Sequence, residues 1–148
     1  MTEKNIAVIG AGYWGKNLVR NFHQRGVLKT ICDGAQPIRE EMRAAWVMRG
    51  TDLKSVPLIT ANASDVLKDN DITGVVIAAP AALHFEIAEK ALQAGKHVFV
   101  EKPLSLTRGD GEKLVRLAAE RQKALFVGHI LHYHAAVNSP RASAPISS

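Results

Sequence analysis

Three glycines stand close together after an apolar segment near the start of the chain. Residues 5–9 read Asn-Ile-Ala-Val-Ile, and Gly10, Gly12 and Gly15 follow ahead of a helical pattern. The first glycine allows a sharp turn off a strand, the second leaves room for a diphosphate, and the third lets the helix pack closely. The N–H groups and positive dipole of that helix would then face the phosphates. A plain strand–turn–helix needs only one glycine, so the spacing favours a dinucleotide site.

An acidic residue stands where such a site needs one. Asp33 lies 18 residues after Gly15, at the end of the predicted strand 29–33, where a carboxylate accepts hydrogen bonds from the adenosine ribose. A carboxylate there repels a 2′-phosphate, and Gly34 and Ala35 follow it rather than arginine or serine. We therefore predict NAD in preference to NADP. The alternative, that Asp33 only caps a turn with Gly34, fits this offset less well.

Strand-like segments alternate with helical patterns along the chain. The predicted strands are 6–9, 29–33, 57–60, 74–79, 97–101 and 125–129. The predicted helices are 14–25, 36–49, 63–69, 81–94 and 109–123. Several strands are continuous apolar runs, which suits parallel strands covered on both faces. The alternation predicts a single α/β domain of the Rossmann type, with a doubly wound parallel sheet and right-handed crossovers.

The composition fits an ordinary globular domain of 148 residues, with 47% hydrophobic and 22% charged residues. No run is long enough to cross a bilayer, and polar residues 3–5 interrupt any signal peptide. The formal charge is +5, but basic and acidic residues are mixed, so we expect neither a nucleic acid nor a membrane as partner. The one cysteine, Cys32, excludes an internal disulfide and fits a reducing cytoplasm. We expect it to be a buried, inert thiol.

Two later motifs make the pattern more specific. Residues 76–84 read Val-Ile-Ala-Ala-Pro-Ala-Ala-Leu-His, and residues 95–104 read Gly-Lys-His-Val-Phe-Val-Glu-Lys-Pro-Leu. With the glycine turn and Asp33, they resemble the Gfo/Idh/MocA family, named after glucose–fructose oxidoreductase and inositol dehydrogenase. The resemblance covers residues 5–137, and the Glu-Lys-Pro triplet is its most specific part.

The resemblance implies which residues form the nicotinamide half of a cleft. Ala79, Pro80 and His84 match positions that line this half of the cleft. Glu101 and Lys102 match the pair beside the nicotinamide. Pro103 matches a proline that often follows a cis peptide bond, which would re-aim the lysine side chain. The resemblance also implies hydride transfer between a carbinol and the nicotinamide, with Lys102 and Glu101 as the catalytic pair. The alternative for His84 is a local hydrogen bond at a helix start.

Hydride transfer assisted by Lys102 and Glu101 is reasonable on physical grounds. Hydride transfer from a carbinol needs a neighbouring group to hold the hydroxyl and share its proton. Lys102 follows a predicted strand, at the edge where parallel sheets bind ligands, and this position disfavours the alternative of a plain surface lysine. A partly desolvated lysine suits proton transfer, and Glu101 could orient it.

Two aromatic residues, Tyr13 and Trp14, stand inside the glycine turn. Large exposed aromatic side chains are unusual there without a partner. We count both among the candidate cofactor contacts, where they would cover the pyrophosphate or touch the substrate. Packing against a neighbouring loop is the alternative.

Three histidines, His129, His132 and His134, stand near the end of the chain. On a strand the last two share a face and the first points away, which does not give a tetrahedral zinc site. We therefore predict no metal. The stretch instead resembles the last strand of family members that act on nucleotide-linked sugars, especially those oxidising C3 of a UDP-N-acetylhexosaminuronate. The related pattern usually has proline where this chain has Ala135.

The final segment differs in composition. Residues 138–148 hold two prolines and four serines, and we predict disorder there and a nucleotide-binding domain over residues 1–137. Family members continue into a second α/β domain that supplies the substrate pocket, and the sequence has no counterpart, so we interpret the chain as truncated. We expect it to bind NAD(H) but to turn over slowly or not at all. Apolar surface around the last strand should cause self-association or poor solubility.

Three functional hypotheses remain open. The first is an NAD-dependent sugar dehydrogenase, cytoplasmic and represented by its nucleotide domain, with a carbohydrate or nucleotide sugar as the substrate of full-length members. The second is a stand-alone NAD-binding or NAD-sensing module that regulates a partner. The third, a scaffold that has lost its cofactor, is least favoured because the glycines and Asp33 are all present.

Overall fold

Six parallel strands form one sheet in the computed structural model, which describes residues 3–128. The strands are β1 (Ile6–Ile9), β2 (Leu28–Cys32), β3 (Leu58–Thr60), β4 (Gly74–Ile77), β5 (His97–Glu101) and β6 (Leu125–Gly128). Their order is β3-β2-β1-β4-β5-β6. The chain thus winds outward in one direction from β1 and in the other from β4, which confirms the predicted Rossmann-type α/β fold.

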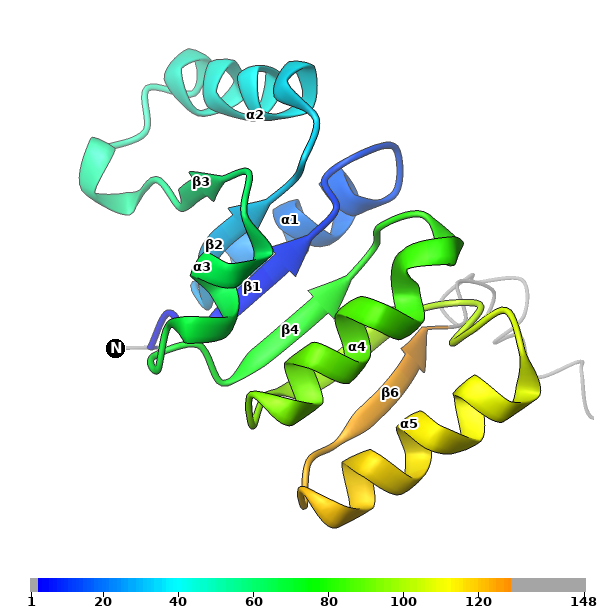
Figure 1. Cartoon of the computed structure of the whole chain (residues 1–148). Coiled ribbons are helices and arrows are strands. Elements are labelled where there is room, and N and C mark those ends of the chain that lie inside the picture. Colours follow the sequence, from blue (N-terminus) through cyan, green and yellow to red (C-terminus); the bar gives the residue numbers. More distant parts are fainter. Residues whose placement is uncertain (1–2, 129–148) are drawn as a thin grey trace, which may run out of the picture.

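Five helices connect the strands, with α4 and α5 in front of the sheet and α1 behind it in Figure 1. They are α1 (Gly15–Gln24), α2 (Gln36–Met48), α3 (Ala63–Lys68), α4 (His84–Gln93) and α5 (Arg108–Glu120), with 3₁₀ turns η1 (Leu53–Ser55) and η2 (Ala81–Leu83). The helix predicted over 81–94 is therefore divided, and α4 begins only at His84. Among residues 3–128, no helix is long and apolar enough to cross a membrane.

Parts of the sequence interpretation lie outside the described residues. They are the three histidines at 129, 132 and 134, the end of the domain expected over residues 1–137, and the segment 138–148. The last strand, expected over 125–129, is described as far as Gly128.

Successive residues of the central strands face two separate cores. On one face, Ala7, Val75 and Val98 pack beneath α3, α4 and α5. On the other face, Val8 and Val76, which pair in the sheet, pack beneath α1 and α2. Because a strand alternates its side chains, this burial on both sides is what the continuous apolar runs predicted.

Two phenylalanines, on β5 and β6, lie on the same face of the sheet as α1. Phe99 of β5 pairs in register with Phe126 of β6 and also with Val76 of β4, so all three side chains share the face that α1 covers. Phe99 is half-buried, whereas Phe126 is 62% exposed. The apolar surface expected near the last strand is thus present at Phe126, and the self-association that it would cause stays a prediction.

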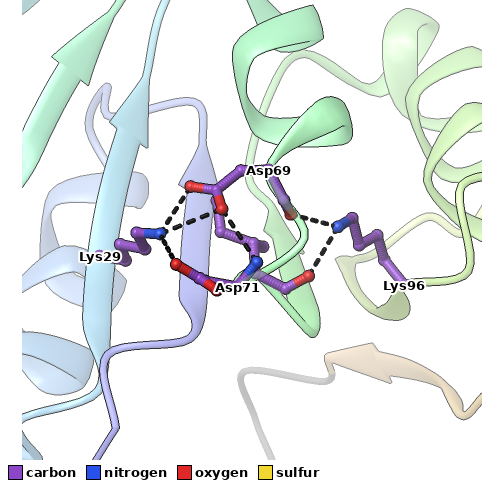
Figure 2. Close-up of polar contacts among 5 residues, drawn as sticks. Lys29, Asp69, Asp71 and Lys96 are labelled. Carbon is purple, nitrogen blue, oxygen red and sulfur yellow. Dashed lines mark hydrogen bonds and ion pairs between the residues drawn. The ribbon is translucent and has the colours of Figure 1, made fainter.

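Two lysines hold the loop before β4 at the amino edge of the sheet (Figure 2). Lys29 Nζ lies 2.8 Å from Asp69 Oδ2 and 3.0 Å from Asp71 Oδ2. Lys96, which is only 4% exposed, donates from Nζ to the carbonyl oxygens of Asp69 at 2.6 Å and Ile72 at 2.7 Å. The hydrogen bond from Lys29 lowers the pKa of Asp69, and burial lowers the pKa of Lys96. This network joins β2, the loop before β4 and the residue before β5.

Replacing Lys96 with methionine tests the contribution of the buried amine. Lys96→Met removes both hydrogen bonds and leaves two carbonyl oxygens without that donor, so we expect the free energy of unfolding to fall by about 1–3 kcal/mol. Urea denaturation measures it. In the matched control, Lys90→Met, the exposed ion pair with Glu86 on α4 is lost, and the free energy of unfolding should change less than in Lys96→Met. Equal stability of Lys96→Met and the wild type would contradict the role of this network.

The dependence of the unfolding free energy on pH, at acid pH, tests the contribution of the Asp69 carboxylate. Its pKa in the folded state lies below the ordinary value of 3.8, so its stabilisation is present above that value and is lost as the pH falls through the folded-state pKa. The pKa of Lys29 is raised above 10.5 by its hydrogen bond to Asp69, so its contribution is lost only at high pH. We expect the difference in unfolding free energy between wild type and Asp69→Asn to be constant near neutral pH and to shrink below about pH 4. Urea denaturation at a series of pH values measures this difference, and an unchanged difference down to about pH 2 would contradict it.

Candidate functional site

The segment between β1 and α1 crosses the carboxyl end of β4 in close main-chain contact. Gly10 has a φ of +93°, and a Cβ built there would lie 2.5 Å from the main-chain nitrogen of Ala79. A Cβ on Gly15 would overlap the carbonyl oxygen of Gly10. Beside Gly12 the space is open, and the nearest atom to a Cβ there is Ile38 Cδ1 at 4.0 Å. Packing thus requires two of the glycines, and the third leaves a gap through which a ligand can approach.

The carboxylate of Asp33 joins this turn to the loop after β2. Its Oδ2 accepts a hydrogen bond from the N–H of Ala11 at 2.8 Å, and its Oδ1 accepts one from the N–H of Ala35 at 2.9 Å. Each carboxylate oxygen has a second lone pair, so the group can still accept hydrogen bonds from ligand hydroxyls. The two sequence interpretations, a turn cap and a ribose acceptor, are therefore compatible.

Arg39 reaches the same loop from the first turn of α2. Its Nη1 donates to the carbonyl oxygens of Asp33 at 2.9 Å and Gly34 at 2.8 Å. Arg39 stands six positions after Asp33 and was not among the site residues predicted from sequence. A side chain in the first turn of a helix leans toward the helix amino end, and this signal could have placed it at the loop.

A cavity of about 680 Å³ runs along this edge of the sheet. The predicted site residues that line it are Gly10, Gly12, Tyr13, Trp14, Asp33, Ala79 and Pro80. Apolar walls come from Ile38, Leu83 and Ile87, which the sequence analysis missed because periodicity alone does not show which helical residues meet a strand end. The volume is that of an ordinary ligand pocket. The open main chain at Gly12 and the carboxylate at one end fit a dinucleotide.

The two aromatic residues of the turn pack on each other. Tyr13 and Trp14 are 79% and 52% exposed, and their rings meet edge to face with centroids 5.3 Å apart. Trp14 lines the cavity and also a second one on the α1 side. Its indole therefore contributes to the walls of both cavities.

The second cavity, of about 650 Å³, lies between α1 and β5 and contains Glu101. Phe22, Phe99 and Asn17 also line it. Burial raises the pKa of the Glu101 carboxyl, and the charge of His84 opposes that rise. Within residues 3–128, Glu101 Oε2 is buried and has no hydrogen-bond partner. A buried carboxylate oxygen without a partner at a strand end is typical of functional sites.

Lys102 and His84 line neither cavity. Lys102 is exposed, directly after β5, and its peptide bond to Pro103 is cis, as the resemblance implied. His84 is 2% exposed, with Nε2 2.6 Å from the carbonyl oxygen of Ala79 and Nδ1 2.6 Å from that of Pro103. The second of these partners is 19 residues away, so the histidine makes more than the local contact considered from sequence.

Cys32 lies at the end of β2 and lines the first cavity. Its side chain is 3% exposed, and burial raises the pKa of the thiol to about 11. At neutral pH almost none of it is the reactive thiolate. The predicted burial of the thiol is confirmed, and its inertness, with which the raised pKa agrees, stays a prediction.

Comparison with known proteins agrees with this geometry. Residues 4–129 match the model of the Gfo/Idh/MocA oxidoreductase family, described as an NAD-binding Rossmann fold. UDP-N-acetylglucosamine 3-dehydrogenase of Acidithiobacillus ferrooxidans is 30% identical over 137 residues, which are 93% of this chain and 40% of that protein. The dTDP-3,4-didehydro-2,6-dideoxy-alpha-D-glucose 3-reductase of Streptomyces violaceoruber is 40% identical over 76 residues, which are 51% of this chain and 22% of that protein. The chain thus spans less than half the length of these relatives.

Solved structures show the same fold. The WlbA dehydrogenase of Bordetella pertussis, in complex with NADH and UDP-GlcNAcA, superposes with a TM-score of 0.74 at 28% identity, over 93% of this chain and 40% of that one. Biliverdin reductase of Synechocystis, in complex with biliverdin and NADP⁺, gives 0.77 at 30% identity, over 96% and 43%. With a family model that matches most of its length, the chain belongs to the Gfo/Idh/MocA oxidoreductases and corresponds to their NAD-binding Rossmann domain.

Proposed function

We propose that this chain is the coenzyme-binding domain of a nucleotide-sugar dehydrogenase that transfers a hydride between a carbinol and NAD. The observation that carries the proposal is the 680 Å³ cavity, which extends from the Asp33 carboxylate past the open main chain at Gly12 to Ala79 and Pro80. Support for the substrate class comes from relatives whose names specify UDP- and dTDP-linked sugars. A UDP-N-acetylhexosaminuronate is the finer proposal, since one solved neighbour is in complex with UDP-GlcNAcA.

Each part of the coenzyme would meet a different group of this chain. Asp33 would accept hydrogen bonds from the adenosine ribose, and the diphosphate would lie against Gly12 and the amino end of α1. Ala79 and Pro80 would line the nicotinamide end. When bound, NAD supplies the hydride acceptor.

The protein's own chemistry would come from the end of β5. Lys102 would hold the reacting hydroxyl and, as the neutral amine, take up its proton while the hydride passes to NAD, because it is the exposed lysine at the carboxyl end of that strand. Glu101, next to it, keeps a carboxylate in a half-buried position and would orient the lysine. Lys102 is exposed in the described structure, so its desolvation would depend on the bound coenzyme and substrate.

Substitution of Gly12 tests whether the gap beside the turn holds a diphosphate. Gly12→Ala meets no atom closer than 4.0 Å, so we expect stability within about 1 kcal/mol of wild type. The new methyl group occupies the approach to the turn, so NADH affinity should fall at least about tenfold. Calorimetric titration with NADH measures it.

Two further glycines make the test specific. Gly109→Ala also enters open space, in α5, and should leave NADH affinity unchanged. Gly15→Ala would overlap the Gly10 carbonyl oxygen and should lower stability instead. The proposal is wrong if the wild type does not bind NAD(H), or if Gly12→Ala binds it as tightly.

The preference for NAD over NADP is tested at Asp33. A negative charge a few ångströms from a 2′-phosphate costs several kcal/mol near a protein surface before salt screening. Asp33→Asn removes that charge and should narrow the ratio of NAD to NADP affinities by about tenfold or more. Arg39, held at the same loop, would pair with the phosphate, so Arg39→Ala in that background should reverse part of the gain.

Asp52→Asn is the matched control. Asp52 also accepts a main-chain N–H, that of Lys54 at 3.1 Å, but it does not line the cavity. Its substitution should leave both affinities unchanged. Tighter binding of NADP than NAD by the wild type would overturn the preference, while leaving the dinucleotide site intact.

A further inference from the structure

His84 connects two segments that both belong to the candidate site. It is the first residue of α4, and its ring lies between the carbonyl oxygen of Ala79, at the end of β4, and that of Pro103, in the loop after β5. Ala79 lines the coenzyme cavity, and Pro103 directly follows Lys102. The imidazole therefore spans from the wall of the cavity to the loop that carries the lysine.

The two contacts are short, and the imidazole that makes them is buried. Both nitrogen–oxygen distances are 2.6 Å, and His84 is 2% exposed. Both partners are carbonyl oxygens, which only accept, so each contact is a hydrogen bond when the ring nitrogen that faces it carries a proton. Such bonds in a buried position are stronger than bonds exposed to water. The charge of His84 lowers the pKa of the Glu101 carboxyl, against the rise caused by burial. Glu101 therefore supplies negative charge close to the ring when it is ionised.

Among residues 3–128, the loop after β5 has few other contacts of this kind. Pro103 has no main-chain N–H, so its carbonyl is its only polar main-chain group. The N–H of Lys102 donates to the carbonyl oxygen of Gly128 at 3.3 Å, which is a long hydrogen bond. Beyond them, Leu104 packs on the core, and Ser105 bonds within the loop. The contact with His84 at 2.6 Å is therefore the short attachment next to the lysine.

We propose that His84 is a positioning residue that holds the Lys102–Pro103 loop against the end of β4 and thereby sets where the Lys102 amine lies relative to the nicotinamide. It touches neither cavity, so it acts through Lys102 and not on the coenzyme itself. This inference rests on the proposed function for the role of Lys102, whereas the attachment of the loop does not.

The attachment is tested by hydrogen exchange without any coenzyme. His84→Phe keeps a ring of similar size and removes both ring nitrogens, so the amide of Lys102, which donates to the carbonyl oxygen of Gly128, should exchange at least about tenfold faster than in the wild type. His84→Gln retains a donor group and should recover part of the protection. His97→Phe is the matched control, because His97 also bonds to the main chain, accepting from the N–H of Ala124 at 3.0 Å, but at the opposite end of β5. It should leave exchange of the Lys102 amide unchanged. Unchanged exchange in His84→Phe would overturn the proposal.

The action through Lys102 is tested by the ratio of the dissociation constants for NAD⁺ and NADH. A cation beside the nicotinamide disfavours the positively charged oxidised ring, so Lys102→Met should shift affinity toward NAD⁺. We expect His84→Phe to shift the ratio the same way by at least about threefold, and to have no further effect in the Lys102→Met background. Thermal unfolding is recorded for every variant, because a purely structural role would lower stability and leave the ratio unchanged.

The outcomes separate this inference from the proposed function. A shift by His84→Phe that persists in the Lys102→Met background would overturn the action through lysine. If Lys102→Met does not move the ratio, or if neither coenzyme binds, the proposed role of Lys102 fails, and hydrogen exchange still decides whether His84 holds the loop.

Discussion

Close main-chain packing between the turn after β1 and the end of β4 determines where the rest of the site lies. Gly10 rests against Ala79, and Gly15 against Gly10, so neither position has room for a side chain. The Asp33 carboxylate then ties the turn to the loop after β2 through the N–H groups of Ala11 and Ala35. The ends of three neighbouring strands thus form one unit. Because main chain builds it, its shape does not depend on side-chain rotamers, and little ordering is left for a ligand to impose.

The same strand, β4, is held at both ends by a buried side chain that contacts two carbonyl oxygens. At its start Lys96 donates to Asp69 and Ile72, and at its end His84 contacts Ala79 and Pro103. These two side chains flank α4, one as its first residue and one three residues after its end. The helix is therefore attached to both edges of the sheet as well as packed on its face. Such attachments are directional, whereas apolar packing alone allows a helix to slide, so they fix the lining of the cavity in register with β4.

The sequence predicted the parts of this arrangement that follow from local periodicity and from glycine spacing. Six strands, five helices, the separate role of Gly12 and the position of Asp33 are of this kind, and the cis bond before Pro103 followed from the resemblance. What sequence did not predict depends on polar side chains with distant main-chain partners. Lys96 bonds to the carbonyl of a residue 27 positions away, and no periodic pattern of side chains records where a carbonyl oxygen will lie. The helix predicted over 81–94 is divided at His84, whose contact with Pro103, 19 residues away, is also one that periodicity does not record.

Glu101 shows how these constraints meet at the end of β5. Its Oε2 is buried without a hydrogen-bond partner among residues 3–128, which destabilises the fold unless something else contacts it. It lines the second cavity, between α1 and β5, and Trp14 lines both this cavity and the one beside the glycine turn. Exclusion of water from the second cavity would raise the pKa of Glu101 further, because desolvation already does so, while the charge of His84 opposes the rise. The protonation of Glu101 therefore depends both on what fills the second cavity and on the histidine that contacts the Lys102 loop.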